Sequence, residues 1–196
     1  MKSVEYKLIL IKTKDNVIKK FFDDYFSING SNVDDVLVYT LENDKAYEEY
    51  NLNNICVSIS ADVGYDVSLF ESNILNKKED IKLLIDIYNK YYIVGYMNVA
   101  KMVLSIINSE DIIKAKKIFL YSFSDDSLLS ITKAMFKSNL NVSKAANIAY
   151  MHRNTAINKL DTIKYKTGLN LQCFEDSIAM YMLLKWLCNL HNHLLF

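Results

Sequence analysis

The order of apolar and polar positions divides the chain into a strand-bearing first part and a helical second part. Apolar residues crowd or alternate in three segments that we expect to be strands: EYKLILIKT (5–13), DDVLVYTLE (34–42) and NNICVSISADV (53–63). Between the first two, DNVIKKFFDDYF (15–26) predicts a helix, and KAYEEYN (45–51) predicts a short one. The longer helix would carry its apolar residues at helical spacing, at Val17, Ile18, Phe21, Phe22 and Phe26.

Helical periods dominate from residue 76 onwards. They run through NKKEDIKLLIDIYNKYY (76–92), VAKMVLSIINS (99–109) and EDIIKAKKIFLYSF (110–123). SFSDDS (122–127) then supplies turn and N-cap residues, and four further helical patterns follow. We therefore predict an α+β protein: a small mixed α/β domain with a helical connector over 1–123, and an all-α domain over 124–196.

The segment NVSKAANIAYMHRNTAINKL (141–160) predicts two helices joined by a very short turn. Such a turn is too short for the chain to reverse, so the helices must cross at a steep angle. Ala145, Ala146 and Ala149 would let the second helix approach closely, with Ile148 filling the remaining gap. These features are typical of a helix-turn-helix.

The second helix of the pair would bury one stripe and expose the opposite side. At 100° per residue, Ala156, Leu160 and Ile163 form the buried stripe. The outward side would carry amide, hydroxyl and basic side chains, which can read base edges or contact phosphates. We expect Arg153, Asn154, Thr155 and Asn158 to read bases, and Lys144, His152 and Lys159 to contact phosphates, with His152 also at the N-cap.

Charge is distributed unevenly, although the net charge of the chain is zero. Residues 1–126 carry −5, whereas residues 127–196 carry +5. A basic C-terminal third that contains a tight helix pair favours a polyanionic partner. Chance segregation of solvated charges is the alternative.

The residues of the helix pair and its surroundings resemble the C-terminal helix-turn-helix domain of bacterial PucR/CdaR-type transcriptional regulators. The shared elements span about residues 128–187. They are Asn141–Val142, Ala145–Ala146, His152–Thr155, Leu160 with Ile163, Thr167–Leu169 and the acidic pair Glu175–Asp176. One departure is that Ala156–Lys159 stand where the family usually has a stretch with two basic residues, which affects the affinity or the sequence read.

The first part of the chain is more loosely similar to the degenerate cyclase-like domain of the same regulators. ICVSISADVGYDVSLFESN (55–73) resembles its strand-and-turn segment. The resemblance implies a sensory or dimerisation role for residues 1–123 and an unknown small-molecule or protein effector.

Other kinds of chemistry find little support. No two of the four glycines share a phosphate-loop spacing, and no enzyme signature occurs, so we expect no catalysis and no cofactor. A zinc site of His191, His193, Cys173 and Cys188 fits no common spacing, and we expect no metal. Three scattered cysteines and apolar windows interrupted by Lys, Asn or His predict a cytoplasmic protein without a membrane span.

The sequence thus predicts a regulator that binds specific double-stranded DNA as a homodimer. The alternative is a protein–protein interaction module that keeps the helix-turn-helix scaffold and uses its apolar last helix, CFEDSIAMYMLLKWL (173–187), to bind a partner. Arg153 is the only arginine in the chain, which favours this alternative modestly. A small enzyme is a third class without a supporting motif.

Overall fold

A computed structural model describes residues 5–42, 49–120 and 125–188, and the chain divides into two compact units, one up to Met102 and one from Val103. The expected domain boundary at 123/124 lies outside the described residues. The overall class is α+β, as predicted.

Among the described residues of the first unit, the strands form one five-stranded sheet in the order β2-β3-β1-β4-β5. β1 lies antiparallel to β3 and β4, whereas β4 lies parallel to β5. The first four strands with α1 and α2 follow the β-α-β-β-α-β order of a split βαβ, or ferredoxin-like, arrangement. The elements of this unit are β1 (Tyr6–Lys12), α1 (Asn16–Phe26), β2 (Ser31–Val33), β3 (Val36–Glu42), α2 (Leu52–Val63), β4 (Ser68–Leu75), α3 (Lys78–Tyr91) and β5 (Gly95–Met97).

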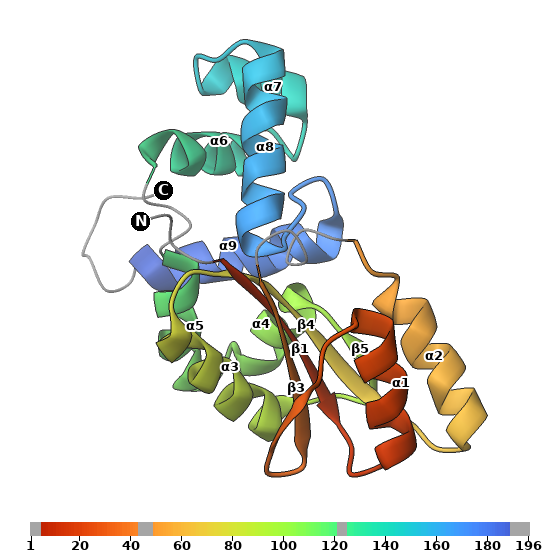
Figure 1. Cartoon of the computed structure of the whole chain (residues 1–196). Coiled ribbons are helices and arrows are strands. Elements are labelled where there is room, and N and C mark those ends of the chain that lie inside the picture. Colours follow the sequence, from red (N-terminus) through yellow and green to blue (C-terminus); the bar gives the residue numbers. More distant parts are fainter. Residues whose placement is uncertain (1–4, 43–48, 121–124, 189–196) are drawn as a thin grey trace. The chain divides into compact units, whose positions relative to one another are not determined.

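Helices α1 and α2 cover one face of the sheet, and α3 covers the other (Figure 1). On the first face, Ile18 and Phe22 of α1 and Cys56 of α2 pack against Ile9 and Tyr39 of the strands. On the second face, the buried side chains of α3 include Leu84 and Tyr88. Both faces of β1 are therefore buried, which explains its nearly continuous apolar run.

The segment 53–63 is a helix, so the predicted strand is wrong. It forms α2, capped by the Asn51 side chain at its start and by Gly64 at φ 75° at its end. The alternation of Ile55, Val57 and Ile59 suggested a strand. The residues that α2 buries are instead Leu52, Cys56 and Ile59, at helical spacing, because the sheet lies on that side.

Most other predicted elements of this unit are confirmed. The strands predicted over 5–13 and 34–42 are confirmed as β1 and β3, and the helix over 15–26 as α1. Most of the short helix expected over 45–51 lies outside the described residues. In α1, Ile18, Phe22 and Phe26 are buried as expected, whereas Val17 and Phe21 are exposed.

The second unit is helical. The boundary between the units falls within α4, and α5 packs against α9. Its described elements are α4 (Val99–Ile106), α5 (Asp111–Leu120), α6 (Asp126–Lys137), α7 (Val142–Ile148), α8 (Arg153–Thr167) and α9 (Phe174–Cys188). In the parts of the chain that the structure describes, no helix has both the length and the apolar character needed to cross a bilayer.

Candidate nucleic-acid interface

Helices α6, α7 and α8 form a three-helix unit in which α7 and α8 are joined by a four-residue turn (Figure 1). Ala145 and Ala146 on α7 are fully buried, which brings the two helices close together. The turn is closed by the backbone N–H of Met151, which donates to the carbonyl of Ala146 at 2.9 Å. Tyr150 takes a left-handed backbone conformation, with φ 52°, at this reversal. The predicted tight joint is confirmed; of its three alanines Ala145 and Ala146 are buried, whereas Ala149 lies in the turn and is half-buried.

Both helices of the pair have defined ends. The side chain of Asn141 accepts the backbone N–H of Lys144 at 3.0 Å and caps α7. His152 caps α8, because its Nδ1 accepts the backbone N–H of Asn154 at 3.3 Å. Gly168 ends α8 at φ 72°, a left-handed position that glycine adopts without strain. These caps set where α8 begins and which residues lie in its first turn.

Helix α8 buries one stripe and exposes the opposite side. Ala156, Leu160 and Ile163 are buried as predicted, together with Thr167. Ile157 is half-buried at the flank of the stripe. Most predicted contact residues are exposed on this three-helix unit, namely Lys144, His152, Arg153, Asn154, Thr155 and Asn158. The structure thus brings one exposed group of amide, hydroxyl and basic side chains to the start of α8.

Arg153 links the two helices at this surface. Its Nε donates to the hydroxyl of Ser143 on α7 at 3.3 Å. Arg153 is exposed. Its position is compatible with base reading, because a bidentate contact to guanine needs a fork of accessible guanidinium N–H groups.

Lys159 is placed differently from the other predicted contact residues. Its ammonium donates to the hydroxyl of Ser127 and lies 3.8 Å from the carboxylate of Asp125, at the start of α6. Hydrogen bonds from the side chain and backbone of Ser127, with a smaller contribution from Lys159, lower the pKa of Asp125. Lys159 therefore joins α8 to the N-cap of α6, an intramolecular role that its sequence position did not indicate.

Comparison with known families identifies helices α6, α7 and α8 as part of a known type of domain. Residues 128–186 match the family described as the PucR C-terminal helix-turn-helix domain. Residues 128–186 form a PucR-type helix-turn-helix domain. This match confirms the resemblance drawn from His152–Thr155 and Thr167–Leu169.

One solved structure is similar to a longer part of the chain than the PucR-type domain. The crystal structure of a regulator of polyketide synthase expression from Bifidobacterium adolescentis is similar to the chain at 9% identity and a TM-score of 0.43. The match covers 97% of this chain and 82% of that one. No curated protein matches the chain. The cyclase-like similarity of the first unit stays a prediction, because the matched family covers none of it.

One predicted packing role in the PucR-type domain is wrong. Ile148 does not fill a gap behind α8, because it is the last residue of α7 and 43% exposed. The residues of α7 that are buried are instead Ala145 and Ala146. The exposed turn also contains Tyr150, which sequence reasoning missed and which is 98% exposed. A left-handed turn position is usually marked in a sequence by Gly or Asn, and neither residue occurs in the turn around Tyr150.

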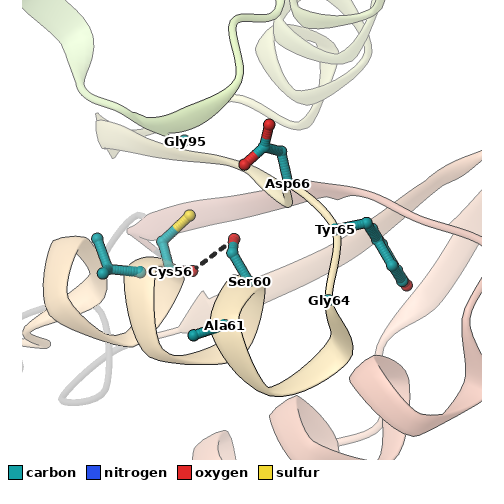
Figure 2. Close-up of a pocket in the computed structure, with 8 residues that line it drawn as sticks. Cys56, Ser60, Ala61, Gly64, Tyr65, Asp66 and Gly95 are labelled. Atoms are coloured by element: carbon teal, nitrogen blue, oxygen red, sulfur yellow. Dashed lines mark hydrogen bonds between the residues drawn. The ribbon is translucent and has the colours of Figure 1, made fainter.

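Away from the PucR-type domain, the first unit has an open hollow of about 520 Å³ between α2 and the start of β5 (Figure 2). Two of its lining side chains are engaged by the fold. The Cys56 thiol donates to the carbonyl of Val67 at 3.4 Å, and Ser60 accepts the N–H of Val67 at 3.0 Å. Burial raises the pKa of the Cys56 thiol. A thiol held in this way is a poor nucleophile, because the thiolate is the reactive form.

The zinc set considered from the sequence cannot be assembled from the structure. His191 and His193 lie outside the described residues, and Cys173 is exposed at the start of α9. Within the described ranges, no group of three His, Cys, Asp or Glu side chains is placed to hold a metal.

Proposed function

We propose that the protein is a sequence-specific double-stranded DNA-binding transcription regulator that inserts α8 into the major groove and acts as a homodimer. The observation that carries the proposal is the exposed start of α8, where Arg153, Asn154, Thr155 and Asn158 are accessible while the opposite stripe is buried. An α-helix fits the major groove, where each base pair presents a distinct pattern of donors and acceptors. Such a regulator works where the DNA is, so we place it in the cytoplasm.

The base-reading roles follow from side-chain chemistry. Arg153 suits guanine, and Asn154 and Asn158 suit adenine, because each can make a bidentate contact with that base. Thr155 suits a thymine methyl or a single hydrogen bond. All four lie within the first two turns of α8, which is the part of a recognition helix that contacts base edges.

The phosphate-contacting roles are shared by Lys144, His152 and Lys159. Lys144 is exposed in the first turn of α7. A neutral His152 whose Nδ1 accepts the N–H of Asn154 carries its proton on Nε2, which is then a donor for a phosphate oxygen. Lys159 must leave Asp125 and Ser127 to reach a phosphate, so we expect it to contribute less than Lys144.

The first experiment is selection of bound fragments from a random duplex library with the purified full-length protein. Binding to the best selected duplex is then compared with Arg153→Ala and Asn158→Ala. Each variant is expected to weaken binding by about 1–3 kcal/mol and to relax the preference at one base pair, because each removes a base contact.

The matched controls are Lys137→Ala, for an exposed cation on α6, and Gln172→Ala, for an exposed amide outside α8. Both controls should bind the selected duplex as the wild type does. If Arg153→Ala and Asn158→Ala also bound like the wild type, the proposed role of α8 would be wrong.

A further inference from the structure

Helix α1 of the first unit is apolar on two sides, and only one of them faces the sheet. Ile18, Phe22 and Phe26 are buried beneath it. On the solvent side, Val17 is 69% exposed and Phe21 is 42% exposed. Tyr25, at 39% exposed, continues the row and stacks on Phe21 with ring centroids 6.0 Å apart. We call Val17, Lys20, Phe21, Asp24 and Tyr25 the α1 outer face.

The α1 outer face is hollowed in the way that helix packing requires. Val17, Lys20, Phe21 and Asp24 line an open hollow of about 550 Å³ together with Asn16. These four residues stand at positions i, i+3, i+4 and i+7, which is the spacing of the four residues that form a hole for a side chain of a facing helix. A bulky apolar side chain such as Phe21 is the kind that fills such a hole.

The charges of the α1 outer face are complementary to themselves. Lys20 and Asp24 lie on one edge of the apolar row, because at 100° per residue they are about 40° apart and both precede Val17 and Phe21 around the helix. A two-fold axis level with residue 22 would lay two copies of α1 antiparallel. Lys20 of one copy would then face Asp24 of the other, twice, with the Phe21 side chains meeting near the axis.

We propose that the α1 outer face is the surface through which two copies of this chain dimerise. The inference rests on the proposed homodimer and names its interface. Each copy of the α1 outer face supplies both a hole and the Phe21 side chain that can fill one. It also supplies both a cation, Lys20, and an anion, Asp24. A second copy is therefore the partner that matches the face in shape and in charge. The helix has 11 residues and is about 16 Å long, so the contact is small and the dimer is expected to depend on concentration.

The test uses sedimentation equilibrium of the full-length protein without DNA, over a range of concentrations. Lys20→Glu places two acidic residues opposite each other, and Asp24→Lys places two cations opposite each other. Each variant alone is expected to raise the dimer dissociation constant at least tenfold. An equimolar mixture of the two should dimerise again, because Glu at 20 then faces Lys at 24 and Lys20 faces Asp24.

Several results would overturn the proposal. They are a wild type that is monomeric throughout, single variants that dimerise like the wild type, and a mixture that stays monomeric. The second result would show that the dimer forms through another surface, such as α9. Val57→Ser, on an equally exposed apolar position of α2, should dimerise normally. Circular dichroism of each variant checks that α1 still folds.

Failure of this inference is separable from failure of the proposed function. A chain that dimerises through α1 but binds no duplex supports the interface and contradicts DNA binding. A chain that binds its selected duplex but sediments as a monomer contradicts the interface alone.

Discussion

Asp23 on α1 links its helix to β3 and to the loop before β2 through one carboxylate. Its Oδ1 accepts the backbone N–H of Gly30 and the hydroxyl of Tyr39, each at 2.8 Å, and its Oδ2 accepts the ammonium of Lys19 at 2.6 Å. Burial alone would raise the pKa of Asp23, but these hydrogen bonds together lower it. A carboxyl whose pKa is lowered on folding stabilises the folded state above its unfolded pKa and loses that contribution as the pH falls.

Asp23→Asn is therefore expected to destabilise the unit by about 1–2 kcal/mol at pH 7, since hydrogen bonds to a charged acceptor are weakened or removed. The difference from the wild type should shrink as the pH falls from about 5 through the lowered pKa of Asp23. Thermal unfolding followed by circular dichroism over pH 3–7 measures this. Asp86→Asn, at an exposed helical aspartate of the same unit, should show a much smaller difference. A wild type and Asp23→Asn that differ equally at every pH would contradict the assignment.

The proposed contact residues differ in how far the sequence predicts their surroundings. Arg153, Asn154, Thr155 and Asn158 could be placed from the sequence, because the buried stripe of α8 sets the direction of all four. Lys159 has a similar sequence signal, yet its ammonium is held by Asp125 and Ser127. The hydrogen bond to Ser127 joins residues 32 positions apart, and a local pattern cannot reveal it.

At the scale of elements, the α7–α8 joint depends on side chains that are small enough. Ala146 is 1% exposed within the helix-turn-helix, and its carbonyl also accepts the N–H that closes the turn. A longer side chain there would push α7 away from its neighbours, because a packed interior has few voids to absorb it. The position of α8 relative to α7 therefore depends on the small size of the Ala146 side chain.

Ala146→Leu is expected to destabilise the helical unit by about 1–3 kcal/mol through overpacking. It should also reduce binding to the selected duplex at temperatures where the variant is still folded, since it shifts α8 without removing a contact residue. Asn147→Leu, at the next and exposed position of α7, is the matched control. Thermal unfolding and duplex titration of both variants measure the effects, and equal behaviour of the two would show that the joint tolerates bulk.

At the scale of the whole molecule, the two candidate functions differ in their response to salt. Contacts to phosphates release counterions, so DNA binding weakens steeply as salt is added. A partner held by an apolar helix face responds much less. The basic charge of residues 127–196, +5, is modest and is compatible with only a few phosphate contacts.

If Lys144 and Lys159 of both copies contact phosphates, a plot of log binding constant against log salt should have a slope of about −3 to −4. Lys144→Ala should bring the slope closer to zero, by about one unit for each phosphate that the variant no longer neutralises. Titration of the selected duplex by fluorescence anisotropy, between about 50 and 300 mM salt, measures the slope. A slope near zero would favour the protein–protein alternative.

Features of the protein that depend only on neighbouring residues can be predicted from the sequence. The N-cap at His152, the buried stripe of α8 and the tight joint could all be predicted, because capping bonds and helical periodicity act over a few positions. Tertiary structure decided what depends on distant contacts. It made 53–63 a helix against the sheet, left Ile148 in solvent, and selected which of the two apolar sides of α1 is buried. Apolar residues record that a side can be buried, whereas the surface that covers it is supplied by segments far away in the chain.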